Sequence, residues 1–296
     1  MRKNLAGVFC PITTPFIEET VAIKKLGENI EKFNSTGLSG LVVLGSTGEA
    51  VHLNLQEKIR IIQTTRNYLA GDKILIVGTG HQSTYETIEF TKQVADLGAD
   101  YALVLTPHYY KSDVHDDGFY RHYVTVADQA PIPILLYNVP KFTGINLNIE
   151  VVKKLAIHPN IQGIKDSYPM IAQLVELITL NCDTFQVLVG SDTLFLAGIF
   201  LGAAGAILAL ANVLPDECVY IYQNVISGDY EAAKRKFFEI LPLARALTGK
   251  YGIPAIKAVL DMIGYFGGQP RSPLQPLTQD QKQELQNLIH RIKTIN

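Results

Sequence analysis

The chain has 296 residues, of which 47% are hydrophobic and 18% are charged, and its formal net charge is −2. This length accommodates one large α/β domain or two ordinary ones, with ample apolar side chains for a sizeable core. The nearly balanced charge provides neither a basic field nor an acidic tail, so we expect no nucleic-acid partner.

The N-terminal segment, the apolar stretches and the cysteines indicate where the protein works. Residues 1–5 lead directly into the first predicted strand without the apolar region of a signal peptide. The longest apolar stretch, residues 193–214, is interrupted by glycines and fits a buried helix followed by a strand. Cys10, Cys182 and Cys218 lie far apart and show no metal-ligand spacing. We therefore expect a cytoplasmic protein with buried, reduced thiols, no membrane span and no metal.

Eight short apolar runs recur along the chain, and segments with helical periodicity alternate with them. The predicted strands lie at residues 7–13, 40–44, 74–77, 101–105, 133–137, 161–167, 186–189 and 205–209. The predicted helices between the first five strands lie at about residues 22–35, 54–70, 84–97 and 118–129. Strands that alternate with helices favour a parallel sheet, and eight such units predict an α/β fold of the (β/α)8 TIM barrel type.

The C-terminal part of the chain has a different pattern. After about residue 216 no strand pattern recurs, and helical periodicity is found at residues 229–247, 254–263 and 278–292. The sequence therefore predicts a TIM barrel over residues 1–225 and a C-terminal helical region, packed on the barrel, over residues 226–296. A doubly wound open sheet is the alternative, although such a sheet more often has fewer strands and a glycine-rich first turn, which this chain lacks.

Polar side chains follow several of the predicted strands. Lys165 ends the sixth strand, Tyr137 ends the fifth, and Ser46 and Thr47 follow the second. The carboxyl ends of barrel strands share one face, so these residues are expected to meet at its mouth. Burial among apolar walls disfavours the charged form of a lysine, and a neutral amine attacks carbonyl carbons to give a Schiff base. Tyr137 is then placed to relay protons.

Each of these residues also has an ordinary structural interpretation. A lysine at a strand end is commonly a solvated surface residue, and a tyrosine is commonly a core residue with a satisfied hydroxyl. The pattern Ser46-x-x-Glu49 is typical of a helix capping box. The same glycine-flanked turn also offers N–H groups and hydroxyls to an anion. Because it lacks the lysine of a P-loop, a small carboxylate fits the turn better than a nucleotide does.

Three motifs in this order resemble those of the dihydrodipicolinate synthase / N-acetylneuraminate lyase family. They are Gly45–Glu49, Tyr137–Pro140 and Gly163–Asp166, and the likeness extends over nearly the whole chain. The resemblance implies a class I, metal-independent lyase on a (β/α)8 barrel, with a small-molecule 2-oxo acid as its partner. It also implies a homotetramer, built as a dimer of dimers, and no cofactor apart from the covalent imine that a lysine forms with the substrate.

The resemblance assigns roles to residues at the strand ends. It implies that Lys165 forms the imine with pyruvate or another 2-oxo acid, and that Tyr137 shuttles protons. Ser46 and Thr47 would bind the carboxylate of the 2-oxo acid. Tyr110 would complete a proton relay across the subunit interface.

The resemblance also implies which residues surround the substrate. Gly190 and Ile207 match positions whose backbone carbonyls line the pyruvate pocket. Synthases of the family typically carry an arginine two residues after the proline of the Tyr-Asn-Val-Pro motif, where it holds the carboxylate of the aldehyde substrate. This chain has Phe142 there, with Lys141 beside it. Phenylalanine cannot supply a charged, bidentate fork.

Two further segments resemble different enzymes of the family, so together they indicate no single substrate. The segment 106–123 is similar to its counterpart in 4-hydroxy-2-oxoglutarate aldolases, whereas residues 46–50 are similar to those of neuraminate lyases. We therefore predict a lyase that makes or breaks a carbon–carbon bond in a 4-hydroxy-2-oxo acid. The alternatives are a 4-hydroxy-tetrahydrodipicolinate synthase of lysine biosynthesis, a neuraminate lyase or 2-keto-3-deoxy sugar-acid aldolase or dehydratase, and a non-catalytic 2-oxo acid binding barrel.

Overall fold

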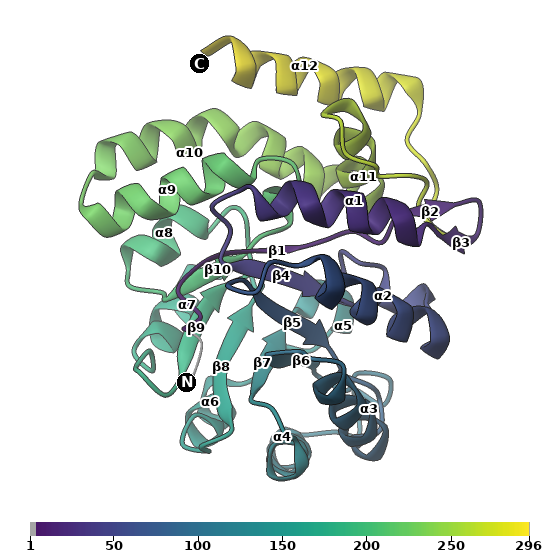
Figure 1. Ribbon diagram of the computed structural model, residues 1–296. Coiled ribbons are helices and arrows are strands. Elements are labelled where there is room, and N and C mark those ends of the chain that lie inside the picture. The colour runs from purple at the N-terminus through teal and green to yellow at the C-terminus, as the bar shows by residue number, and fades with distance from the viewer. Residues whose placement is uncertain (1–3, 296) are drawn as a thin grey trace.

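The structure, a computed structural model, describes residues 4–295, with side chains described to residue 292. Eight parallel strands form a closed barrel in the order β1-β10-β9-β8-β7-β6-β5-β4 (Figure 1). Their bounds are β1 Gly7–Pro11, β4 Gly40–Val43, β5 Ile74–Gly78, β6 Tyr101–Leu105, β7 Ile134–Asn138, β8 Ile161–Asp166, β9 Gln186–Val189 and β10 Gly205–Ile207. The predicted TIM barrel is confirmed.

Helices surround the barrel and bury the outer faces of its strands. They are α1 Ile23–Asn34, α2 Leu55–Tyr68, α3 Thr84–Asp96, α4 Asp116–Gln129, α6 Ile149–Leu155, α7 Ile171–Ile178, α8 Phe195–Phe200 and α9 Pro215–Ser227. Short elements complete the connections: the hairpin of β2 Phe16–Ile17 and β3 Thr20–Val21, the helix α5 Pro140–Thr143, and the 3₁₀ turns η1 Ala50–His52 and η2 Ala209–Asn212. The sequence pattern predicted neither the hairpin nor α5.

The alternation of side chains along the strands builds two apolar layers. Successive side chains of a strand point to opposite faces, so one set fills the barrel and the other packs under the helices. In β7, Leu136 belongs to the outer layer and Tyr137 to the barrel interior. In β8, Ile164 belongs to the outer layer, so Lys165 points inward. Because Tyr137 pairs with Lys165 in the parallel register, the two side chains share one level of the barrel.

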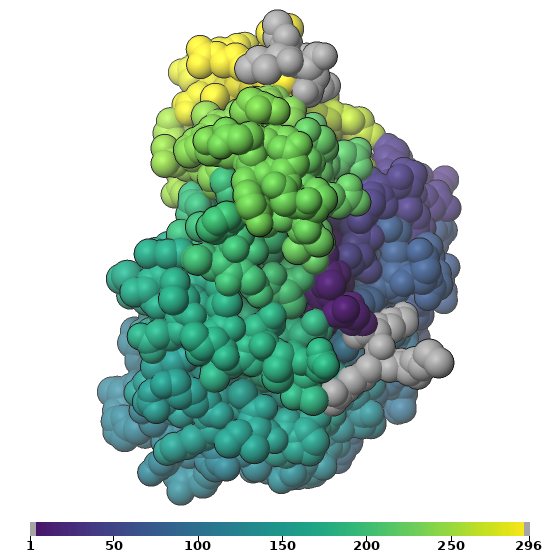
Figure 2. Space-filling view, turned by 90° about the vertical axis from the view of Figure 1, so that its left-hand side faces the viewer, coloured from purple at the N-terminus to yellow at the C-terminus, as the bar shows by residue number. Residues whose placement is uncertain are grey.

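The C-terminal region is helical, as predicted. It contains α10 Tyr230–Ala244, the π-helix η3 Arg245–Tyr251, α11 Ile253–Met262 and α12 Gln279–Ile295. Helix α10 packs against α9, and α12 packs across α10 and α11. Figure 2 shows the same stacking from the side, with the green α9 and α10 surface between the yellow α12 and the teal part of the barrel. Helix α9 runs through the predicted boundary at residue 225 before it ends at Ser227.

The structure excludes one of the two interpretations of the turn after β4 and corrects one expectation about the cysteines. The segment 46–49 is not a capping box, because Glu49 has a left-handed backbone (φ 55°) and the following turn η1 has no side-chain cap. The capping box belongs instead to Asn54 and Glu57, which begin α2. The three cysteines are free, but Cys182 is exposed rather than buried. None of the helices within residues 4–295 is long and apolar enough to cross a membrane.

Candidate active site

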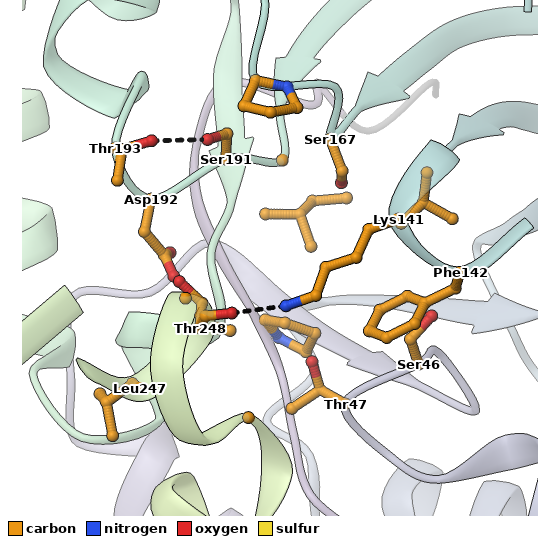
Figure 3. Close-up of a pocket in the computed structure, with 18 of the residues that line it drawn as sticks. Ser46, Thr47, Lys141, Phe142, Ser167, Ser191, Asp192, Thr193, Leu247 and Thr248 are labelled. Carbon is orange, nitrogen blue, oxygen red and sulfur yellow. Dashed lines mark hydrogen bonds between the residues drawn. The ribbon is translucent and has the colours of Figure 1, made fainter. Parts of the chain in front are cut away.

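A pocket of about 310 Å³ opens at the carboxyl ends of the barrel strands. It lies where the sequence analysis placed the working face, and eight of the predicted site residues line it together. These are Ser46, Thr47, Tyr137, Lys141, Phe142, Lys165, Gly190 and Ile207. Figure 3 shows the pocket with many of its lining side chains.

Lys165 supplies an amine to this pocket. Its side chain is only 4% exposed, and its Nζ lies 4.2 Å from the centre of the Tyr137 ring. Among the side chains that the structure describes, to residue 292, none forms a hydrogen bond or ion pair with this amine, so it is open to a ligand in the pocket. Gly190 preserves the space that the amine needs, because a Cβ there would lie 2.2 Å from Ser167 Oγ and 3.1 Å from Lys165 Cε.

Tyr137 connects the amine with the turn that follows β4. Its ring lies beside Lys165 Nζ, and its hydroxyl lies 3.4 Å from Ser46 Oγ. Tyr137 is buried, and it lines the pocket together with Ser46 and Lys165. The ring of Tyr137 thus lies beside the amine, and its hydroxyl lies beside Ser46.

The turn Gly45–Glu49 presents unpaired donors to the pocket. Glu49 N–H donates to the Ser46 carbonyl at 3.1 Å, which closes the turn. In the part of the chain that the structure describes, no acceptor is found for the N–H groups of Ser46 and Thr47, and both residues line the pocket. Adjacent free N–H groups with hydroxyls make a concave anion site, which suits a carboxylate. The structure thus favours the anion-binding interpretation of this turn over the capping box.

Behind the turn lies a buried ion pair that the sequence analysis missed. Lys257 Nζ, on α11, lies 2.6 Å from Glu49 Oε1, and both side chains are at most 1% exposed. Glu49 Oε2 also accepts a hydrogen bond of 2.9 Å from the backbone N–H of Arg271. The C-terminal region therefore fixes the residue that ends the anion-binding turn. Burial lowers the pKa of Lys257, and the charge of Glu49 acts in the opposite direction.

Two buried carboxyl groups accompany the lysine. Asp192 lines the pocket and accepts a hydrogen bond from the N–H of Leu210 at 3.3 Å. Asp166 follows Lys165 and accepts one from the Asn138 amide at 2.7 Å. Burial raises the pKa of each carboxyl group to about 6. Asp192 lies three residues beyond the end of β9 at Val189, and this position was a sequence signal to which the prediction gave no role.

The outer rim of the pocket is cationic. Lys141, from α5, extends across the pocket and donates a hydrogen bond of 2.7 Å to the carbonyl of Thr248 (Figure 3). Arg245, the first residue of η3, also lines the pocket, and the sequence analysis missed it. Phe142 lies between the rim and solvent with 57% of its side chain exposed. Tyr110 is the one predicted site residue that does not line the pocket of this chain.

Tyr110 faces away from the protein. It is 68% exposed, and its ring packs edge-on against Tyr109 with 5.0 Å between the ring centres. The role that the resemblance implies for it requires a second subunit, so that role stays a prediction. Among residues 4–295, no group of three or more histidine, cysteine or acidic side chains is placed to hold a metal ion.

A (β/α)8 barrel with a pocket amine, a neighbouring phenol and a turn with free N–H groups has the groups that a Schiff-base-forming lyase needs. Comparison with known proteins agrees, since the model of the dihydrodipicolinate synthetase family matches residues 4–292. The 4-hydroxy-tetrahydrodipicolinate synthase of Thermodesulfovibrio yellowstonii is 36% identical over 283 residues, which cover 96% of this chain and 97% of the relative. The chain therefore belongs to the dihydrodipicolinate synthetase family.

Solved structures agree with this assignment. The chloride-inhibited dihydrodipicolinate synthase of Acinetobacter baumannii, crystallised with pyruvate, superimposes with a TM-score of 0.93 at 32% identity, covering 98% of this chain and 99% of that chain. A monomeric dihydrodipicolinate synthase variant superimposes with a TM-score of 0.92 at 30% identity, covering 97% and 96%. The protein is thus a lyase of this family, whose enzymes use a lysine Schiff base with pyruvate and no external cofactor.

Proposed function

We propose that Lys165 forms an imine with pyruvate or a closely related 2-oxo acid. The neutral amine adds to the ketone carbon, the hydroxyl of the resulting carbinolamine takes up a proton, and water leaves, which gives an iminium ion. Loss of a proton from the adjacent carbon gives an enamine, and this attacks an aldehyde to make a carbon–carbon bond; the reverse sequence breaks that bond. The observation that carries the proposal is the amine of Lys165, which has no hydrogen-bond or ion-pair partner among the described residues and lies 4.2 Å from the centre of the Tyr137 ring in the pocket.

The neighbouring residues divide the remaining tasks. Ser46 and Thr47 offer free N–H groups and hydroxyls to the 2-oxo acid carboxylate, which orients the ketone toward the amine. Tyr137 moves protons between the amine and the reacting carbon. Gly190 and Ile207 form the wall of the inner pocket, and Gly190 leaves room for the lysine side chain.

Two reactions are candidates for the step that makes or breaks the carbon–carbon bond. The names of the curated relatives support condensation with aspartate semialdehyde, the reaction of a 4-hydroxy-tetrahydrodipicolinate synthase, which our sequence analysis places second. We take this reaction as the first candidate. Cleavage of a 4-hydroxy-2-oxo acid is the second candidate, and Phe142 is the observation that favours it, because it provides no charged fork for the aldehyde's carboxylate.

One pair of assays tests the proposal and separates the candidates. Borohydride added with pyruvate should leave a single reduced adduct, mapped by mass spectrometry to Lys165. Condensation of pyruvate with aspartate semialdehyde is then measured beside pyruvate release from 4-hydroxy-2-oxoglutarate. Reduction at another lysine, or no adduct at all, would overturn the imine; the ratio of the two rates assigns the reaction.

We also propose a cytoplasmic homotetramer. The exposed Tyr109 and Tyr110 pair supports an assembly in which Tyr110 reaches a neighbouring site. Three free thiols suit a reducing compartment. Because one similar structure is a monomeric variant, the mass in solution is the decisive measurement. Sedimentation velocity should give four times the mass of the chain, and a monomer with full activity would exclude a role for Tyr110 in another subunit.

A further inference from the structure

We propose that Glu49 and Lys257 hold the anion-binding turn, residues 45–49, in the shape that binds the carboxylate of the 2-oxo acid. Both are positioning residues, because neither lines the pocket and each acts through Ser46 and Thr47, which do. The C-terminal region thereby sets the affinity of the inner pocket for an anion. This inference rests on the proposed function, which places the carboxylate at this turn.

The backbone is strained at both ends of the turn. Leu44 and Glu49 have φ angles of 56° and 55°, and they are two of the three non-glycine residues with a positive φ in the part of the chain that the structure describes. Residues with bulky side chains rarely adopt this left-handed conformation. It persists where the surrounding structure over-determines it. The turn therefore needs contacts from outside to keep its donors directed at the pocket.

The outside contacts converge on the carboxylate of Glu49. Lys257 Nζ lies 2.6 Å from Glu49 Oε1, and the backbone N–H of Arg271 donates to Oε2 at 2.9 Å. His52 Nδ1 lies 3.3 Å from the same Oε2. The side chain of Glu49 is fully buried and that of Lys257 is 1% exposed, so solvent does not compete for these contacts. Because two distant segments hold its two oxygens, the side chain has a fixed direction, and this stabilises the left-handed backbone of Glu49.

The segment that supplies these contacts is itself attached to the barrel. The amine of Lys257 also donates to the carbonyl of Gln269 at 2.8 Å. Gly267 lets this segment pass close to α11, because a Cβ there would lie 1.9 Å from the carbonyl oxygen of Lys257. The guanidinium of Arg271 pairs with Glu57, on α2, at 2.6 Å. The support behind the turn is thus anchored to α11 at one end and to α2 at the other.

The balance of charge gives a second reason for the pair. Glu49 lies two residues after Thr47, so an unpaired carboxylate there would repel an anion bound at the turn. Lys257 supplies the counter-charge, which leaves the free N–H groups of the turn to attract the anion. A buried ion pair is often no more stabilising than apolar side chains of the same volume, so stability alone does not account for it.

The test measures imine formation at Lys165 with two ketones that differ in charge at one end. These are pyruvate and its uncharged methyl ester, and sodium cyanoborohydride traps the imine that each forms. Wild-type protein should reach its half-maximal trapping rate at a much lower concentration of pyruvate than of the ester. In Glu49→Met/Lys257→Met, the half-saturating pyruvate concentration should rise by about 10- to 100-fold, the scale of effect expected when a bound reactant is misplaced by about 1 Å.

The same variant should leave the two other rates nearly unchanged. The half-saturating concentration of the ester and the maximal trapping rate with pyruvate should stay within about threefold of wild type, because Lys165 and Tyr137 keep their contacts. The variant buries no lone charge, and its melting temperature shows whether it is folded. A loss that is confined to the charged ketone separates positioning of the turn from a general disturbance of the site.

Glu49→Gly/Lys257→Met tests the strain at the turn. Glycine adopts a positive φ without strain, so this variant should recover part of the pyruvate affinity that Glu49→Met/Lys257→Met loses. Lys73→Met is the matched control, because it removes another buried lysine, whose amine donates to the carbonyls of Thr36 and Leu38 outside the pocket lining. It should leave the preference for pyruvate over the ester unchanged.

Three results would overturn the inference. The first is a wild-type preference for pyruvate in Glu49→Met/Lys257→Met. The second is an equal loss with pyruvate and with the ester, which would mean that the pair only stabilises the fold. The third is a Glu49→Gly/Lys257→Met variant that binds pyruvate no better than Glu49→Met/Lys257→Met. A wild-type protein without a trapped imine on Lys165 would instead overturn the proposed function.

Discussion

Two lysines of this protein are buried to a similar degree, but their surroundings are opposite. Lys257 is 1% exposed and has Glu49 Oε1 2.6 Å away, with the carbonyl of Gln269 accepting a further hydrogen bond at 2.8 Å. Lys165 is 4% exposed and has no such partner among residues 4–295. A buried ammonium is costly unless it is paired and hydrogen-bonded. Burial alone therefore does not indicate function; the lack of a partner does.

A third lysine supports the same distinction. Lys73 is buried directly before β5, and its amine donates to the carbonyls of Thr36 and Leu38 at 2.9 and 2.7 Å. Lys73 and Lys257 thus join segments of the fold through their charged heads. Lys165 is instead directed into a pocket with a phenol beside it. Its environment suits a group that changes its bonding during a reaction.

The largest expected effect comes from removing the unpartnered lysine. Lys165→Met keeps an unbranched apolar side chain in the barrel but cannot form an imine. We expect kcat/KM to fall by more than about 1,000-fold, the scale seen when a catalytic nucleophile is removed. The melting temperature should change little, because the substitution removes a buried amine that forms no hydrogen bond or ion pair among the described residues and loses only its contact with the Tyr137 ring. Activity above a hundredth of wild type, or a marked loss of stability, would break the comparison between Lys165 and Lys257.

Tyr137→Phe tests the group beside the amine. Loss of a positioned proton-transfer group typically costs about 10²- to 10⁴-fold, and we expect that loss in kcat rather than in KM for pyruvate. Borohydride should still trap the imine, although more slowly than in wild type. Tyr222→Phe is the control, because the hydroxyl of Tyr222 donates to the carbonyl of Ala204 outside the pocket. A KM effect alone would mean that Tyr137 only shapes the pocket.

The barrel and the inner end of the site could be predicted from the sequence, because both depend on local patterns. Strand alternation directs Tyr137 and Lys165 inward, and motif resemblance assigns their roles. The ion pair of Glu49 and Lys257 could not be predicted, since its members lie on segments that are far apart in the chain and meet only in the folded protein. Arg245 was missed for another reason: periodicity over residues 229–247 predicts a continuous α-helix and does not reveal the π-helix that begins at that residue.

Lys257→Met tests the paired lysine in the comparison with Lys165. It leaves the Glu49 carboxylate buried without its counter-charge, and breaking such a pair costs about 3–5 kcal/mol of unfolding free energy. We expect a large shift in the urea midpoint. The double variant Glu49→Gln/Lys257→Met should recover most of the loss, because no charge is then left unpaired. If Lys257→Met is as stable as wild type, burial and pairing do not distinguish the two lysines in the way we describe.

The smallest expected effect concerns the carboxyl group that shares the pocket with Lys165. Burial raises the pKa of Asp192 to about 6, from a reference value of 3.8. Between these two values the folded protein keeps a proton on Asp192 that the unfolded chain has released. This contribution to the unfolding free energy is therefore complete below about pH 4 and is lost as the pH rises through about 6, by at most about 1.4 kcal/mol per pH unit. Asp166, raised to about 6 by burial as well, adds a slope of the same sign.

Asp192→Asn removes the contribution of Asp192 to this pH dependence of the unfolding free energy and leaves that of Asp166. The amide does not titrate, so the variant should become steadily more stable relative to wild type as the pH rises from 4 to 6, and the difference should then level off. Urea unfolding at closely spaced pH values measures it, and Asp183→Asn, an exposed position, is the control that should show no trend. A stability difference that stays constant across this range would mean that Asp192 is ionised throughout. Lys165 would then have a permanent counter-charge in the pocket. It would differ from Lys257 in the distance to its carboxylate, and not in whether it has one.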